Sequence, residues 1–203
     1  MKITIIGATG NVGSRILNEA LARGHQVTAI ARGAAKLPAR PGLTALALDY
    51  TNTAKLAAAL GGFDAVLGAV KYHSADGKHI LDAVKQAGVK RLLVVGGAGS
   101  LEAAPGLDVV DTPDFPAPWK PEALAAREFL RALRKEPALD WTMLSPSALL
   151  EPGERTGKYR IGSDQLLVDA QGHSKISIED LAKALIDELE QPKHSRKRFT
   201  VGY

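Results

Sequence analysis

A glycine-rich run close to the N-terminus constrains the fold of this chain more than any other feature. The segment Gly7-Ala8-Thr9-Gly10-Asn11-Val12-Gly13 follows the apolar run Lys2–Ile6 and leads into the amphipathic stretch Val12–Arg23. A strand, a glycine turn and a helix in this order open a βαβ unit, in which the helix N-terminus can bind a pyrophosphate. One glycine permits the sharp turn, one lets phosphate approach the backbone, and one lets the helix pack against the strand. We therefore expect a dinucleotide site at this turn.

The chain continues to alternate short apolar runs with amphipathic stretches. Such runs are typical of strands covered on both faces, and their strict alternation with helices favours a parallel sheet. The expected strands are Lys2–Ile6, Gln26–Ala31, Leu43–Leu48, Ala65–Ala69, Arg91–Val95 and Trp141–Ser145, and the expected helices are Val12–Arg23, Ala54–Leu60, Lys78–Ala87 and Glu122–Lys135. The pattern predicts an α/β fold of Rossmann type, a doubly wound and mostly parallel sheet with helices on both faces.

Residues 1–203 are expected to form a single NAD(P)-binding Rossmann domain, in which residues 146–203 include a small substrate-side extension. The expected elements of this extension are strands at Tyr159–Ile161, Leu166–Asp169 and Arg198–Val201 and a helix at Ile178–Leu189, with Ser177 as its cap. Before it, the segment Leu101–Pro121 is rich in proline, which favours a long irregular loop. A loop of this length is more often a functional lid than a simple connection.

The end of the second expected strand indicates which dinucleotide is bound. An NAD-specific site places a carboxylate there for the adenosine ribose, but none occurs between Gln26 and Lys36. Arg32 stands at the strand end instead, and Lys36 follows. A guanidinium can hold a 2′-phosphate through two hydrogen bonds, whereas a carboxylate would repel it. We therefore expect NADP(H) rather than NAD(H), while an unpaired surface arginine would give the same pattern.

Four segments resemble the atypical short-chain dehydrogenase/reductase family, in particular its NADH-flavin reductase subgroup. The spacing G-x-x-G-x-x-G of the first segment is that of the extended and atypical members, and the other three segments are more specific to the subgroup. The segments are Ile6–Gly13, Val94-Val95-Gly96-Gly97-Ala98-Gly99-Ser100, Asp111-Thr112-Pro113-Asp114-Phe115-Pro116 and Glu151-Pro152-Gly153-Glu154-Arg155-Thr156-Gly157. The resemblance covers nearly the whole chain and implies a relation to biliverdin reductase B and to NmrA-like NAD(P)-binding proteins. It also implies that Asp49 and Tyr50 contact the adenine.

The remaining binding residues are expected at the carboxyl ends of the strands, where ligands meet a doubly wound sheet. The fourth strand leads to Ala69 and Val70, the fifth to Gly96 and Gly97, and the sixth to Ser145, so that the nicotinamide should lie between the last two ends. The full set expected to bind the cofactor is Gly7, Thr9, Gly10, Asn11, Val12, Gly13, Arg32, Lys36, Asp49, Tyr50, Ala69, Val70, Gly96, Gly97 and Ser145.

No residue of this set is an obvious proton donor. The Tyr-x-x-x-Lys pair of most short-chain dehydrogenases is absent, and the serine and histidine of biliverdin reductase B align with Gly97 and Ala148. Reduction of a ketone needs an acid, whereas hydride transfer to a flavin or quinone does not need a strong one. Four further residues could reach the pocket, but nothing in their spacing makes them catalytic: Ser100, Lys120, Arg155 and Tyr159. We therefore assign no catalytic residue.

Several other function classes are excluded. The chain has no cysteine, its five histidines form no helical i,i+4 pair, and it lacks a G-x-S-x-G nucleophile motif. Thiolate chemistry is therefore ruled out, and neither a metal site nor hydrolase activity is expected. No apolar run approaches the roughly 20 residues of a membrane span, and the N-terminus shows no leader, so a cytoplasmic location without membrane contact is expected.

These observations predict an NADPH-dependent reductase of a small-molecule acceptor that resembles a flavin or a quinone, with FMN as one candidate substrate. The missing acid groups equally favour a non-catalytic NADP(H)-sensing regulatory protein of the NmrA-like type. The net charge of +4 would allow weak nucleic-acid contact, but the basic run Lys193–Arg198 is better explained as a solvated turn. A homo-oligomer remains open.

Overall fold

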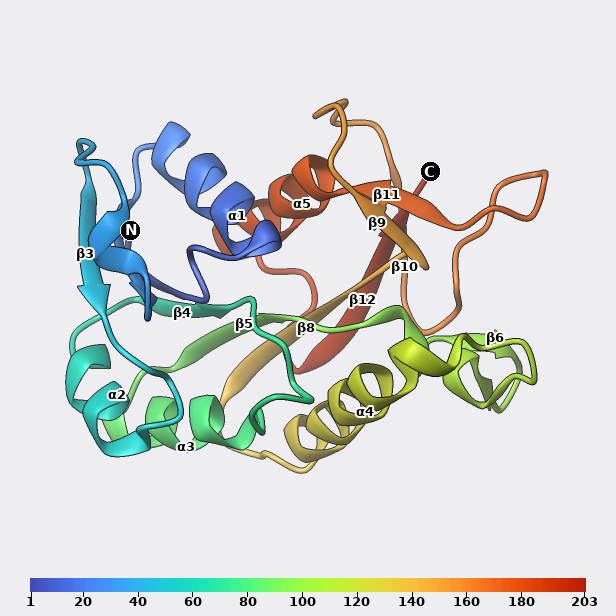
Figure 1. Cartoon of the computed structure of the whole chain (residues 1–203), viewed down its shortest axis with the longest axis horizontal. Helices are drawn as coiled ribbons and strands as arrows, with labels where there is room; N and C mark the ends of the chain where they lie inside the picture. The colour runs from blue at the N-terminus through green and yellow to red at the C-terminus, as the bar shows by residue number, and fades with distance from the viewer.

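The computed structural model describes residues 1–203 and is built around an eight-stranded sheet (Figure 1). The strand order is β10-β12-β8-β5-β4-β1-β2-β3. In chain order the strands of this sheet are β1 Lys2–Ile6, β2 Gln26–Ala31, β3 Leu43–Ala47, β4 Ala65–Gly68, β5 Arg91–Val95, β8 Asp140–Pro146, β10 Arg160–Gly162 and β12 Lys197–Gly202. All neighbouring strands are parallel except β10, which pairs antiparallel with β12 at one edge. This confirms the predicted doubly wound α/β fold.

Five α-helices cover the two faces of the sheet. They are α1 Asn11–Ala22, α2 Thr53–Leu60, α3 Lys78–Ala87, α4 Lys120–Arg134 and α5 Ile178–Glu190. Helices α1 and α5 lie on one face, and α2, α3 and α4 lie on the other (Figure 1). Each layer has its own apolar core, because side chains that alternate along the buried strands point to opposite faces. Ile5 belongs to the core under α1 and α5, and its neighbour Ile6 belongs to the core under α2, α3 and α4.

The switch point of the sheet lies between β1 and β4. From β1 the chain winds outward through β2 to β3, then returns to β4 on the other side of β1 and winds the opposite way through β5 and β8. The connections that follow β1 and β4 therefore diverge, and a crevice is left at their carboxyl ends, where ligands bind in sheets of this type.

The sequence did not predict two small pairs of strands. Strands β6 Glu102–Ala104 and β7 Leu107–Asp108 form a hairpin inside the proline-rich segment, which is therefore not irregular throughout. Strands β9 Leu149–Glu151 and β11 Lys175–Ser177 pair in parallel beside the N-terminus of α5. Both pairs are too short to show a period-2 pattern.

The predicted strand at Leu166–Asp169 is wrong. Residues 166–169 form no strand, and the only pairing nearby is an isolated bridge between Glu102 and Gln165. The apolar character of this run serves packing instead, because Leu167 fills the space beside Gly162, where an added Cβ would lie 3.1 Å from the Leu167 side chain. None of the helices combines the length and the apolar character needed to cross a bilayer.

Candidate cofactor site

Two glycines of the loop between β1 and α1 are required by the packing of the chain itself. Gly7 has a φ of +82°, and a Cβ on it would lie 2.2 Å from the carbonyl oxygen of Ala69. A Cβ on Gly13 would lie 2.1 Å from the carbonyl oxygen of Gly7. At Gly10 the nearest atom would be 3.2 Å away, so this position is less confined. Gly7 and Gly13 therefore fix the shape of the loop, and Gly10 faces the space where a ligand could approach.

The N-terminus of α1 is left open by the protein. Its N-cap, Gly10, has no side chain to accept a hydrogen bond, and the first turn contains no acidic residue. The other four helices each have an acceptor or an acid at this end: Asn52 caps α2, Asp76 accepts from the first N–H of α3, Glu122 lies in the first turn of α4, and Ser177 caps α5. Free N–H groups and the positive end of the helix dipole make such a terminus an anion site.

Arg32 and Lys36 lie next to this loop with no partner in the protein. Arg32 follows the end of β2, and Lys36 ends the short 3-10 turn Ala34–Lys36. Both side chains are exposed and neither enters an ion pair or a hydrogen bond. Gly33 between them reaches Thr9 of the loop, since an added Cβ would lie 4.0 Å from the Thr9 hydroxyl oxygen. The structure thus places the turn that carries the two predicted cations beside the glycine loop.

Asp49 and Tyr50 follow β3 and reach the same side of the sheet. The Asp49 carboxylate accepts hydrogen bonds from the Thr51 N–H at 3.0 Å and the Thr51 hydroxyl at 2.9 Å. These bonds, first the one from the backbone, lower the pKa of Asp49, and the nearby Arg32 charge adds to the effect. The half-buried Tyr50 hydroxyl donates to the carbonyl oxygen of Lys71 at 3.3 Å. Asp49 is therefore an exposed, ionised acceptor, whereas Tyr50 is tied to the chain after β4.

The ends of β4, β5 and β8 carry the rest of the predicted set. Ala69 and Val70 are half-buried, and the Ala69 N–H donates to the carbonyl oxygen of Ile6 at 2.9 Å. A Cβ on Gly96 would lie 2.6 Å from the Met143 sulfur, but one on Gly97 would meet only the Ala126 Cβ at 3.7 Å.

Ser145 is fully buried in β8, and its hydroxyl finds no hydrogen-bond partner. Thr200, its register partner on β12, is equally buried and unpartnered. Ser145 is therefore covered by protein, unlike the exposed predicted residues, and two unsatisfied hydroxyls lie side by side under this end of the sheet.

The motif Glu151–Gly157 forms a strap that joins the C-terminal half of α1 to the N-terminal end of α5. Arg155 makes two hydrogen bonds of 2.7 Å to the carboxylate of Glu19 on α1. Asp180 on α5 accepts from the Thr156 hydroxyl at 2.6 Å, the Gly157 N–H at 2.7 Å and the Tyr203 hydroxyl at 2.8 Å. Burial opposes ionisation of Asp180, but these bonds outweigh it and lower the pKa of its carboxyl. Nothing in the sequence marks Glu19 or Asp180, since both look like ordinary helix carboxylates.

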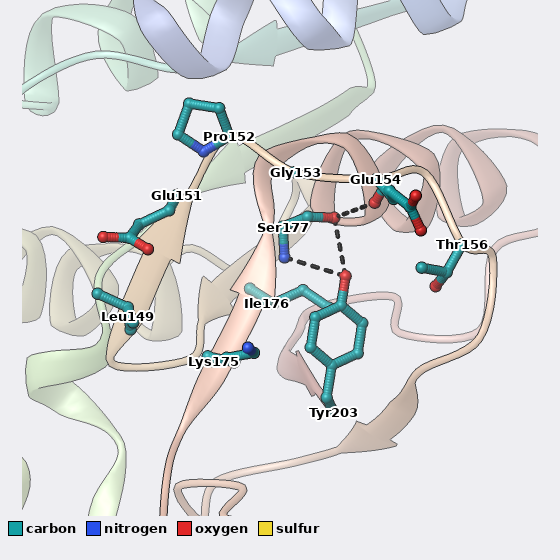
Figure 2. A pocket seen from close by; sticks show the side chains of 10 residues that line it. All are labelled: Leu149, Glu151, Pro152, Gly153, Glu154, Thr156, Lys175, Ile176, Ser177 and Tyr203. Carbon is teal, nitrogen blue, oxygen red and sulfur yellow. Dashed lines mark hydrogen bonds between the residues drawn. The ribbon is translucent and has the colours of Figure 1, made fainter.

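A cavity of about 240 Å³ lies inside this strap (Figure 2). Its lining residues are Leu149, Glu151, Pro152, Gly153, Glu154, Thr156, Lys175, Ile176, Ser177 and Tyr203. The Tyr203 hydroxyl oxygen lies 2.9 Å from the Ser177 hydroxyl oxygen, and the Ser177 hydroxyl donates to the Glu154 carbonyl oxygen at 2.8 Å (Figure 2). No residue of the predicted cofactor set lines this cavity, and a dinucleotide is expected to extend along the strand ends rather than fill it.

Three of the four residues noted beside the pocket are held in structural contacts. Ser100 is buried and its carbonyl oxygen accepts from Arg198 at 2.8 Å. The Tyr159 hydroxyl donates to Asp187 at 3.1 Å, and burial, followed by the Asp187 charge, raises the pKa of this phenol. Arg155 is the strap residue described above. Only Lys120, exposed at the start of α4, has no partner.

Several residues of the basic run Lys193–Arg198 contact other parts of the protein. Arg198 is buried and binds Asp164, and the His194 ring stacks on Phe199 at a centroid distance of 4.3 Å. Arg196 has a φ of 54° in a tight turn and donates to the Pro137 carbonyl oxygen. Arg196 and Arg198 are thus held by contacts within the protein, whereas the side chains of Lys193 and Lys197 stay exposed.

Comparison with known proteins agrees with the prediction that this chain binds a dinucleotide. Residues 7–192 match the model of a family described as NAD(P)H-binding. The Bacillus subtilis protein YwnB is 43% identical over 209 residues, which cover 99% of this chain and 98% of the relative. A solved structure from Bacteroides thetaiotaomicron, described as a "putative epimerase", is 46% identical with a TM-score of 0.96 and covers 100% of this chain and 96% of its own. A Streptococcus pneumoniae structure described as a "putative NADH-flavin reductase" is 36% identical with a TM-score of 0.84, covering 100% and 99%.

Proposed function

Because the chain belongs to the NAD(P)H-binding family, we propose that it binds NADP(H) and reduces a small acceptor of the flavin or quinone class. The open N-terminus of α1 carries this proposal, since it is the one α-helix N-terminus for which the protein supplies neither a capping acceptor side chain nor an acid. A pyrophosphate would receive the free N–H groups there, and Gly10 would let it approach.

The preference for NADP(H) rests on Arg32 and Lys36. Both cations are exposed, unpaired and close to the loop, so either can bind a 2′-phosphate without first breaking an ion pair of the protein. An NAD-specific site would need a carboxylate at the end of β2, and that position holds a cation. The exposed carboxylate of Asp49 remains available for the adenine amino group on the other side.

The acceptor class is inferred from the side chains at the ends of β5 and β8. Bound NADPH would supply a hydride at the nicotinamide ring. Gly97 offers no proton donor at the end of β5, and Ser145 at the end of β8 is buried, so these strand ends bring no acid to a developing alkoxide. A flavin-like or quinone-like acceptor delocalises the incoming charge and places less demand on the protein. The flavin reductase named among the structural relatives agrees with this class.

The first test measures turnover and cofactor choice together. Purified protein is mixed with NADPH or NADH and with FMN or a small naphthoquinone, and the absorbance of the reduced nicotinamide is followed. We expect consumption of NADPH that depends on the acceptor, with NADH less effective. Tight and redox-selective NADP(H) binding without turnover on any acceptor would instead support the NADP(H)-sensing function.

Arg32→Asp tests the cofactor selector. The change removes a charged hydrogen bond and adds repulsion, so NADPH binding should weaken by about 2 kcal/mol or more, while NADH binding is unchanged or improved. Calorimetry measures both affinities. Lys90→Asp is the matched control, because this exposed lysine precedes β5 at the amino end of the strands, away from the predicted site, and the charge change is the same. Equal NADPH affinity in the two variants would show that the selector is misassigned.

A further inference from the structure

A histidine and a glutamate far apart in the sequence meet where the chain leaves β4. His73 lies in the segment Lys71–Gly77 between β4 and α3, and Glu122 lies in the first turn of α4. The Glu122 carboxylate accepts from the Tyr72 N–H at 2.9 Å, the His73 N–H at 2.9 Å and the His73 ring nitrogen Nδ1 at 2.5 Å. Neither residue belongs to the binding set predicted from the sequence.

This geometry decides which nitrogen of the His73 ring can exchange a proton. Two backbone N–H groups donate to the Glu122 carboxylate, and a carboxylate oxygen accepts from Nδ1 only when Nδ1 carries a proton. The other ring nitrogen, Nε2, has no partner in the protein, and the His73 side chain is 45% exposed. A carboxylate that holds one imidazole nitrogen and leaves the other free is the arrangement by which proteins orient a histidine as general acid or base.

The pair is anchored to the predicted nicotinamide side of the sheet. The Tyr72 ring is buried against Phe129 of α4 at a centroid distance of 5.1 Å, and its hydroxyl donates at 2.7 Å to the carbonyl oxygen of Val95, the last residue of β5. Ala123, the neighbour of Glu122, packs against Gly99, where an added Cβ would lie 2.6 Å from the Ala123 Cβ. His73 is thus fixed between the ends of β4 and β5, on the same edge as Gly97.

We propose that His73 donates the proton of the reduction and that Glu122 is a positioning residue that holds its ring. This assignment rests on the proposed reductase function and supplies the donor that is absent at Gly97. Hydride transfer gives a quinone-like acceptor two electrons and leaves negative charge on its oxygen. The Nε2–H bond of the imidazolium then breaks as an O–H bond of the product forms. Nδ1 keeps its proton and its hydrogen bond to Glu122, and Nε2 regains a proton from solvent.

The experiment compares His73→Ala with His173→Ala. His173 is the matched control, because it is an exposed histidine whose Nδ1 also contacts a carboxylate, that of Asp169 at 3.3 Å. We expect His73→Ala to lower kcat for a small quinone by roughly 100-fold, the lower limit of the usual contribution of general acid catalysis, with NADPH affinity unchanged. Added imidazole should restore much of the lost rate in His73→Ala and have no effect on the control.

Glu122→Gln separates positioning from folding. The amide has the same size but only one acceptor oxygen, so it keeps the hydrogen bond of at most one backbone N–H group and no longer carries the charge that orients the ring. We expect kcat to fall and its pH profile to move while KM for NADPH stays constant. In the wild type, NADP⁺ binding should shift the His73 imidazole signals in the nitrogen-correlated NMR spectrum and leave those of His173 in place.

The outcomes distinguish this assignment from the reductase function. If the wild type consumes NADPH and His73→Ala does so at the full rate, or is slowed without rescue by imidazole, the histidine is not the donor although the reductase function stands. If the wild type binds NADP(H) but turns over no acceptor, the proposed reductase function is contradicted, and so is the assignment of His73 as its proton donor.

Discussion

At the scale of single residues, the neighbouring glycines Gly96 and Gly97 have different roles. A Cβ on Gly96 would collide with the Met143 sulfur at 2.6 Å, whereas one on Gly97 would make an ordinary contact of 3.7 Å with Ala126. Gly97 also has a φ of −130° and a ψ of 160°, which any residue can adopt. The first glycine is therefore required by packing, and the second leaves room at the acceptor side.

Gly97→Ser should be about as stable as the wild type, whereas Gly96→Ser should be less stable. We expect the first change to alter the free energy of unfolding by less than about 1 kcal/mol and the second to lower it by about 1–3 kcal/mol through overpacking. Urea denaturation measures both. A Gly97 variant as unstable as the Gly96 variant would contradict the predicted space at this position.

The sequence could predict the residues of the cofactor site whose chemistry is local. The glycine loop and Arg32 follow their strands directly, so strand ends and residue types sufficed to place them together. Their roles toward a bound dinucleotide stay predictions. His73 and Glu122 could not be found this way, because a contact between distant segments depends on how α4 packs beside the end of β4. Nor does residue type reveal that Ser145 is buried without a partner.

At the scale of elements, the strap Glu151–Gly157 depends on carboxylates of α1 and α5. The bond from Arg155 is the largest influence on the pKa of Glu19 and lowers it, and hydrogen bonds lower the pKa of Asp180 despite its burial. A carboxyl whose pKa is lower in the folded chain stabilises it above the unfolded pKa and loses that effect as the pH falls through the folded pKa. The ionised carboxylates of Glu19 and Asp180 therefore hold the strap at neutral pH, and their contribution to stability is lost in acid.

Asp180→Asn should remove this pH dependence. At neutral pH the variant should lose about 2 kcal/mol or more of unfolding free energy, because a buried charged acceptor with several donors is replaced. The difference from the wild type should shrink as the pH falls below the ordinary aspartate value of 3.8. Urea denaturation over a pH series tests this, with Asp82→Asn on the exposed face of α3 as control. A constant difference at all pH values would rule out the ionised Asp180 as the anchor.

Long elements were predictable from the sequence, whereas of the strands of two or three residues only β10 was, at Tyr159–Ile161 against the observed Arg160–Gly162. Strands β1, β2 and β5 begin and end where their apolar runs do, because both faces are buried. The three-residue strands β9 and β11 owe their pairing to the strap and to Tyr203, whose hydroxyl accepts from the Ser177 N–H. The apolar run Leu166–Asp169 was mistaken for a strand, because packing onto Gly162 and pairing in a sheet select the same residue types.

At the scale of the whole molecule, the proposed ligand would connect both halves of the sheet. The loop after β1 and the cations after β2 lie on one side of the switch point, and the ends of β5 and β8 lie on the other. A dinucleotide that bridges them binds only the folded chain and must stabilise it by mass action.

NADPH should therefore raise the melting temperature more than NADH does. At a concentration of about 100 times Kd, binding contributes roughly 2.7 kcal/mol, which corresponds to a rise of about 5–10 °C for a chain of this size. Differential scanning fluorimetry at matched concentrations provides the comparison, and Arg32→Asp should reduce the NADPH effect. Identical shifts with both dinucleotides would contradict the proposed preference, and no shift with either would contradict binding.

The loop after β1 and the cations after β2 also differ in how free they are to vary. Gly7 and Gly13 are confined by contacts within the backbone, so a side chain at either position would disturb the fold of the turn that would receive a phosphate. Arg32 and Lys36 stand on the surface outside that frame and contact nothing the fold needs. If these cations select the cofactor as proposed, cofactor preference and structural integrity are encoded in separate positions. A lineage with this architecture could exchange one nicotinamide dinucleotide for the other through a few surface substitutions while its interior stayed unchanged.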